Sequence, residues 1–128
     1  MKVVSTTNAP AAIGPYSQAL DLGNMVFVSG QIPVDPATGT MADTVEQQTA
    51  QSLANLKAIL AEAGLSMNNV VKTVIFLAAT CTQLRAGNGS AKALAYSAFT
   101  AAKSLMSARK ITVLTTLFME IECIAVRD

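Results

Sequence analysis

The amino-acid sequence predicts a single α+β domain with helices packed on one face of a sheet. Apolar residues at helical spacing alternate with β-rich runs, in the order strand, strand, helix, strand, helix, strand, strand. No internal repeat or low-complexity linker divides the 128 residues, a length that suits one domain spanning 1–128. A sheet that is covered by helices on one face needs a partner or a cavity on the other face.

The β-rich runs are bounded by turn-forming residues or by changes in periodicity. The first run covers 20–28 and is followed by a turn at 35–39, where Pro and Gly stand where turns prefer them. The run 70–77 is rich in β-branched and aromatic residues, as expected of a buried strand. Two further strands are predicted at 111–117 and 118–126.

Two helices are predicted between these runs. Thr44 and Gln47 have the spacing of a capping box, so the first helix is expected from there to Glu62, with Gly64 as its C-terminal stop. The second helix is expected at about 91–105. The apolar residues that recur at helical spacing are Leu53, Leu56, Leu60 and Ala63 in the first helix, and Leu94, Ala95, Ala98, Phe99 and Ala102 in the second.

Composition restricts the possible partners. Nine basic and eight acidic residues give a net charge of +1 without any basic stripe, so nucleic-acid binding is unlikely. The chain is 52% hydrophobic and 13% charged, which favours an oligomer with apolar interfaces. No apolar stretch is long enough to span a membrane, and the N-terminus lacks the apolar core of a signal peptide, so a cytoplasmic location is expected.

The lack of histidine restricts the chemistry. It removes histidine bases, Ser-His and Cys-His nucleophile pairs, and the commonest metal ligand. Cys81 and Cys123 lack the C-x-x-C spacing of a zinc site, and we expect two reduced thiols that act as small hydrophobic residues. A metal site is therefore not expected.

The last predicted strand contains two carboxylates. Strand alternation places Glu120 and Glu122 on one face, about 7 Å apart. Beside apolar neighbours the pKa of a carboxyl group rises, which suits a general acid or base near neutral pH. The alternative is a strand face that is solvated or paired with Arg or Lys.

Other candidate residues lie in loops. The segments 9–19 and 29–33 contain Pro and Gly that should give them defined shapes, so that Tyr16 and Ser29 can form pocket walls; ordinary turns are the alternative. Arg109 could clamp a substrate carboxylate, although an Arg at such a position is more often a surface charge. Asn88, between two glycines, is first of all a turn residue.

Several motifs resemble the RidA/YjgF family of reactive-intermediate deaminases. Segment 9–18 reads Ala-Pro-Ala-Ala-Ile-Gly-Pro-Tyr-Ser-Gln, and segment 29–33 reads Ser-Gly-Gln-Ile-Pro. The resemblance covers 5–77 almost continuously and returns at 120–127, Glu-Ile-Glu-Cys-Ile-Ala-Val-Arg.

The resemblance implies a chorismate-mutase-like α+β domain with a mixed sheet and two helices on one face. It also implies a homotrimer with clefts between subunits, which hydrolyses enamines and imines such as 2-aminoacrylate and 2-iminopropionate to 2-oxo acids and ammonia, without a cofactor. By the same resemblance Glu120 activates water and Arg109 binds the substrate carboxylate. The residues expected to line the cleft are Tyr16, Ser29, Gly30 and Asn88.

Residues 78–118 resemble the family poorly. Ser107-Ala108-Arg109 lacks the proline of the family's Pro-Ala-Arg-Ser motif, and the Leu-Pro turn that should follow is absent. Either the segment has diverged, with an altered deaminase site, or it reflects an incorrect reading such as a compensated frameshift. The resemblance leaves two alternative functions: a 2-oxo-acid-binding regulatory module and an RNA-acting translation inhibitor.

Overall fold

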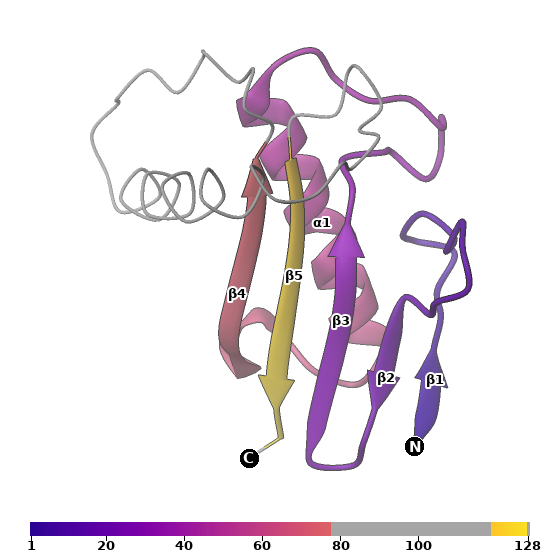
Figure 1. The fold of residues 1–128 in the computed structure, drawn as a ribbon, viewed down its shortest axis with the longest axis vertical. Coiled ribbons are helices and arrows are strands. Elements are labelled where there is room, and N and C mark those ends of the chain that lie inside the picture. The colour runs from indigo at the N-terminus through magenta and orange to yellow at the C-terminus, as the bar shows by residue number, and fades with distance from the viewer. Residues whose placement is uncertain (78–118, 128) are drawn as a thin grey trace.

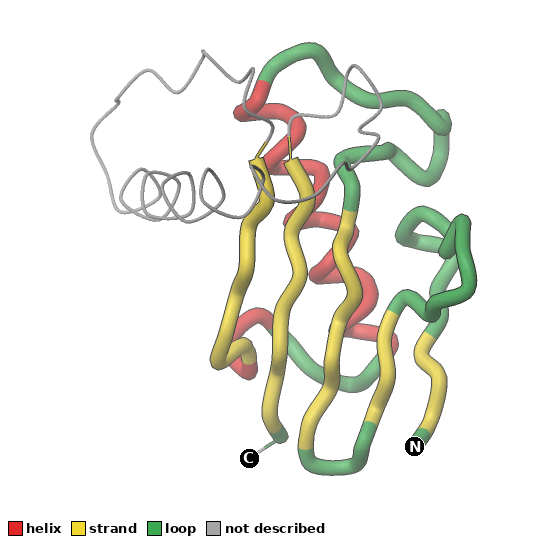
Figure 2. Tube along the Cα trace, viewed as in Figure 1, coloured by secondary structure: helices red, strands yellow, loops and turns green. Residues whose placement is uncertain are grey.

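The computed structural model describes residues 1–77 and 119–127. The predicted helix at 91–105 and the predicted strand at 111–117 lie outside these residues, as does Cys81. The described part is an α+β unit in which one long helix covers one face of a sheet (Figures 1 and 2).

The sheet has five strands in the order β1-β2-β3-β5-β4, and each neighbouring pair among the described strands is antiparallel. The mixed sheet expected from the resemblance is therefore not seen within the described residues. The strands are β1 Lys2–Val4, β2 Ala19–Asp21, β3 Met25–Gln31, β4 Val70–Leu77 and β5 Met119–Val126. Strand β5 lies between β3 and β4, so the end of the chain pairs with its first half (Figure 1).

The run predicted at 20–28 is a hairpin of two strands. Gly23 makes the turn with a φ of 99°, and its amide donates to the Asp21 carboxylate at 2.8 Å. The second strand of the hairpin, β3, continues beyond Val28 to Gln31. The prediction that 29–33 is wholly a turn-forming segment was therefore wrong for its first three residues.

Helix α1, Val45–Glu62, confirms the predicted first helix. The Thr44 hydroxyl accepts a hydrogen bond from the Gln47 amide at 3.3 Å and donates to the Gln47 side chain, so only the Thr half of the capping box forms as expected. The helix ends at Ala63, and Gly64 follows with a φ of 73°. No helix within 1–77 or 119–127 is long and apolar enough to cross a membrane.

The core lies between α1 and strands β3 and β5. The alternation predicted for the last strand is confirmed, because Met119, Ile121, Cys123 and Ala125 are buried while the residues between them are less buried. The buried face of α1 differs from the predicted apolar stripe. Leu56 and Leu60 are buried, but Leu53 is exposed, and three polar residues, Gln48, Ser52 and Asn55, occupy the buried face.

Strand β4 confirms the predicted strand at 70–77, but not its burial. It is the outer strand of the described sheet, and Val71 is 66% exposed. A short 3₁₀ helix, η1 Met67–Asn69, leads into it.

Arg127 connects three parts of the fold. Its guanidinium donates to Asp21 at 2.5 Å and to the carbonyl oxygen of Ala63, at the end of α1, at 3.0 and 3.2 Å. A cation at this position also interacts favourably with the helix dipole. Hydrogen bonds from the Gly23 amide and then from Arg127 hold the pKa of Asp21 below its usual value. The hairpin, the helix and the last strand are thus fixed to one another.

Asn55 fixes the chain that follows β3. Its amide donates to the carbonyl oxygens of Ile32 and Val34 at 3.0 and 2.9 Å, and its own oxygen accepts from Gln51 at 2.9 Å. The Asn55 side chain is almost fully buried, so no water replaces these bonds readily. A polar residue on the buried helix face therefore sets the course of the loop after β3.

We predict that Asn55→Leu destabilises the protein strongly. The substitution keeps a similar volume but leaves two carbonyl groups unpaired, at a cost of about 1–3 kcal/mol each. Urea unfolding followed by circular dichroism measures the change. Lys57→Ala, on the exposed face of the same helix, is the control and should stay within about 0.5 kcal/mol of the wild type. Equal midpoints for the two variants would contradict the role given to Asn55.

Candidate active site

The carboxylate of Glu120 in β5 lies directly over Gly30 in β3. A Cβ atom added at Gly30 would overlap the Glu120 carboxyl group. Gly30 is therefore required by this close approach, because its φ is not positive and it lies in a strand rather than a turn. The two residues that the resemblance assigns to catalysis and to the cleft wall are in contact.

An irregularity in the pairing of β3 with β5 produces this approach. Val28 pairs with Cys123 and Gln31 pairs with Ile121, so Ser29 and Gly30 together stand opposite Glu122. Two residues opposite one define a β-bulge, and bulges redirect side chains beside functional sites. The Gln31 side chain donates to the carbonyl oxygens of Ser29 and Gly30 at 3.1 and 3.3 Å and so supports the bulge.

Ser29 connects the bulge to the N-terminal segment. Its hydroxyl donates to the carbonyl oxygen of Ser17 at 2.7 Å, and its amide donates to the carbonyl oxygen of Gln18 at 3.0 Å. The proton of the hydroxyl is thus engaged with the backbone, while its oxygen remains able to accept a hydrogen bond. Ser29 can line a cleft, but its hydrogen bonds mainly attach the bulge to the backbone of the N-terminal segment.

Glu120 is in an environment that favours its protonated form. Burial, and then the negative charge of Glu122, raise its pKa above the ordinary value. Within the described residues the only ion pair joins Arg127 to Asp21, so no cation in this part of the chain opposes the shift. A carboxyl group whose pKa is raised by burial is better suited to act as a general acid than an exposed one.

Cys123, the free thiol next to this site in β5, has no comparable reactivity. Burial and the charge of Glu122 raise its pKa to about 11, so it remains a thiol at neutral pH. It packs in the core, as expected of a small hydrophobic residue. The described residues contain no group of three potential metal ligands.

Tyr16 lies apart from Glu120. Its amide donates to the carbonyl oxygen of Gly14 at 2.8 Å, which makes a tight turn around Pro15. Tyr16 lines a hollow between the N-terminal segment and residues 32–36, and Glu120 does not line that hollow. The structure thus brings together Glu120, Gly30 and Ser29, and joins Tyr16 to them only through the backbone. Arg109 and Asn88 lie outside the described residues.

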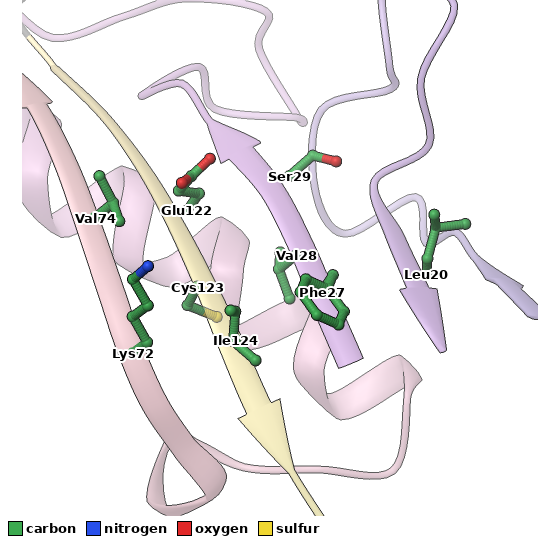
Figure 3. Close-up of a pocket in the computed structure, with 9 residues that line it drawn as sticks. All are labelled: Leu20, Phe27, Val28, Ser29, Lys72, Val74, Glu122, Cys123 and Ile124. Atoms are coloured by element: carbon green, nitrogen blue, oxygen red, sulfur yellow. The ribbon is translucent and has the colours of Figure 1, made fainter. Parts of the chain in front are cut away.

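The sheet face opposite α1 is largely apolar and has a hollow of about 340 Å³ (Figure 3). Leu20, Phe27 and Ile124 occupy neighbouring strands in one row across this face, and Phe27 is 39% exposed. Glu122 and Ser29 lie at one end of the hollow, next to the Glu120 site. The described part of the chain leaves this face without a layer of its own.

The sequence reasoning gave no role to three buried amides: Gln18, Gln31 and Asn55. Each one donates to backbone carbonyl oxygens: Gln18 in the N-terminal segment, Gln31 in the bulge of β3, and Asn55 in the loop after β3. A signal was available for Gln18 and Gln31, because each is a long polar residue beside small residues in a motif already singled out. Asn55 had no such signal, because its spacing alone does not distinguish it from solvent-exposed helix residues.

A model of the family described as endoribonuclease L-PSP matches residues 6–127. A 2-iminobutanoate/2-iminopropanoate deaminase of Salmonella typhimurium is 58% identical over 76 residues, which are 59% of this chain and 59% of that protein. The Escherichia coli K12 protein of the same name is 55% identical over 76 residues, again 59% of each chain. The match thus spans about three fifths of the length of these relatives.

Solved structures resemble the whole chain. The structure of Escherichia coli TdcF with bound serine has a TM-score of 0.71 and 36% identity, and the match covers 100% of both chains. The YjgF gene product of Escherichia coli also has a TM-score of 0.71, with 39% identity and the same coverage. RidA from an Antarctic Psychrobacter is 29% identical, with a TM-score of 0.71 over 99% of this chain and 100% of that one.

We predict that Gly30→Ala abolishes the Glu120 geometry without unfolding the protein. The added methyl group displaces the carboxyl end of a flexible side chain, which can rotate away at a cost of about 1 kcal/mol. Misplacement of a catalytic group by about 1 Å can lower turnover about a hundredfold. A double-mutant cycle with Glu120→Ala isolates the contact: the stability cost of Gly30→Ala should disappear in that background. An unchanged cost would show that the methyl group meets something else.

We also predict that Glu120→Gln stabilises the fold at neutral pH. A group with a raised pKa in the folded state is neutral in both states at low pH and ionised at a cost in the folded state at high pH. The melting temperature of Glu120→Gln should therefore exceed that of the wild type at pH 8. The difference should shrink as the pH falls below the ordinary pKa of a glutamate. A gap that widens toward low pH would mean that the pKa of Glu120 is lowered instead.

Proposed function

Because the chain belongs to the endoribonuclease L-PSP family, which includes the RidA/YjgF proteins, we propose that it hydrolyses 2-imino acids and their enamines. The products are 2-oxo acids and ammonia, and the expected substrates are small, such as 2-iminobutanoate and 2-iminopropanoate. The observation that carries the proposal is the half-buried Glu120 carboxyl group held against Gly30, with its raised pKa. The names of the two curated relatives support the reaction class.

Glu120 has two roles in this mechanism. Its protonated form delivers a proton to the enamine or imine, and the resulting carboxylate then orients a water molecule toward the imine carbon. A C–O bond forms as the carboxylate takes a proton from water, and this proton passes to nitrogen. The C–N bond then breaks as the C=O bond forms, ammonia leaves, and the hydroxyl proton returns to Glu120. A raised pKa suits this exchange, because Glu120 then keeps its proton more readily than an exposed glutamate does.

The other site residues position the substrate. Arg109 binds the substrate carboxylate through its two-pronged guanidinium. Tyr16, Ser29, Gly30 and Asn88 line the cleft. The carboxylate clamp thus holds C1 of a three- or four-carbon acid while the acid–base group acts at the neighbouring imine carbon, and no cofactor takes part.

The proposed assembly is a cytoplasmic homotrimer with its clefts between subunits. The uncovered sheet face supports this assembly, because Val3 and Phe27 are 57% and 39% exposed on it. An apolar face of this kind is stabilised when neighbouring subunits cover it. A cleft at the subunit boundary would also let Tyr16, which is remote from Glu120 within one chain, act in a neighbour's site.

A second candidate function is binding of a 2-oxo acid without turnover. The departure of 78–118 from the family's pattern favours it, because Arg109 lacks its usual proline neighbour. The structure of TdcF with bound serine shows that one relative holds a small amino acid. In this case 2-oxobutyrate should stabilise the protein against heat without release of ammonia.

A coupled assay tests the proposal. A threonine dehydratase generates the imine, and its decay is followed spectroscopically with and without the protein, whose trimer mass is checked by sedimentation. We expect faster hydrolysis by the wild type and a loss of at least about a hundredfold in Glu120→Gln with the trimer retained. Absence of acceleration by a folded trimer would reject the deaminase, and normal turnover by Glu120→Gln would reject the role of Glu120.

A further inference from the structure

Both polar groups of the Gln18 side chain, its carbonyl oxygen and its amide nitrogen, form hydrogen bonds with the N-terminal segment. Its oxygen accepts from the Thr6 amide at 2.6 Å, and its nitrogen donates to the carbonyl oxygens of Thr6, Ala9 and Pro10 at 3.0, 3.2 and 2.8 Å. The residue is almost fully buried. A buried amide with every group paired rigidifies the chain around it.

The segment that Gln18 holds presents apolar side chains to solvent. Ile13 is 82% exposed and Tyr16 is 48% exposed. Within the described residues, the hydrogen bonds of segment 9–16 come from Gln18 or from the short turn at Gly14. An exposed loop with so few hydrogen bonds is expected to be mobile. The buried Gln18 amide that binds this loop therefore indicates that the shape of the loop matters.

The same residue fixes the segment relative to Glu120. The carbonyl oxygen of Gln18 accepts from the Ser29 amide at 3.0 Å, and Ser29 also bonds Ser17 through its hydroxyl at 2.7 Å. Ser29 precedes Gly30, on which the Glu120 carboxyl group rests. Gln18 therefore binds the loop with its side chain, and its main-chain carbonyl group binds the bulge under Glu120.

We propose that Gln18 is a positioning residue, whose carboxamide holds segment 6–17 in the shape that lets Tyr16 form a wall of the substrate cleft. The proposal rests on the proposed function for the identity of the ligand, a small 2-imino or 2-oxo acid. Because Gln18 orders segment 6–17 before the substrate binds, substrate binding does not bear the entropy cost of ordering it. Loss of the Gln18 side-chain bonds should therefore raise KM and leave kcat unchanged. Gln18 itself does not touch the substrate.

The test is Gln18→Met, which keeps the length of the side chain and removes every hydrogen bond that the carboxamide makes. Gln47→Met, an exposed amide at the start of α1, is the matched control. KM and kcat are measured over a range of imine flux from the dehydratase, and hydrogen exchange of the Thr6 and Ser29 amides is followed by NMR. If one molecule in ten retains the bound shape, KM rises about tenfold with kcat nearly unchanged.

Exchange of the Thr6 amide should become at least tenfold faster in Gln18→Met, while the Ser29 amide, which bonds the main chain of Gln18, keeps its protection. A fall in kcat with KM unchanged would mean that the variant merely contains less folded protein, and would overturn the proposal. So would unchanged protection of Thr6. If the wild type hydrolyses no imine, the proposed function fails, whereas Thr6 exchange and the affinity of each variant for 2-oxobutyrate still decide the role of Gln18.

Discussion

The pairing of β5 with β3 is the contact on which the rest of the molecule depends. It joins the end of the chain to its first half, closes the sheet over α1 and brings Glu120 to Gly30. The bulge in this pairing places Gly30 under the Glu120 carboxyl group, which a regular sheet would not do. Without it Gly30 would take a regular place opposite β5 and the position under the Glu120 carboxyl group would differ.

Buried amides stabilise the loops on either side of this contact. Gln18 holds the N-terminal segment, Gln31 supports the bulge, and Asn55 holds the chain that leaves β3. Each replaces backbone partners that these irregular segments cannot find in a sheet or helix. Glu120 and Gly30 thus lie on strands, and two of the three amides that fix the adjoining segments, Gln31 in β3 and Asn55 in α1, also belong to regular elements, which suits precise positioning.

Local patterns in the sequence predicted the elements well. The cap at Thr44, the stop at Gly64 and the alternation along β5 rest on interactions between near neighbours, and all three are found. The bulge at Ser29 was missed, because pairing between strands distant in sequence decides it. The hairpin within 20–28 was also missed, although its strands pair between near neighbours. The polar face of α1 was missed for a related reason: the partners of Asn55 are the carbonyl oxygens of Ile32 and Val34, in a loop that is distant in sequence.

The candidate site was predictable in part. The two-residue period of a strand predicted that Glu120 and Glu122 share one face. It could not predict the need for a glycine at position 30, because that need arises from a contact between residues 90 positions apart in the sequence. Glycine in a motif was read as a turn residue, whereas here it gives room to a side chain from another strand. The location of Tyr16 relative to Glu120 depends on the fold of the N-terminal segment, for which no periodic signal exists.

Strand β5 also has a consequence for how this protein can change over time. Its odd-numbered residues fill the core and its even-numbered residues, among them Glu120 and Glu122, lie on the other face, so the two sets can be altered independently by substitution. An insertion or deletion of one residue would exchange the two sets at once, burying the glutamates and exposing the core. We therefore expect variation in this strand to consist of replacements on one face at a time, with its length held constant.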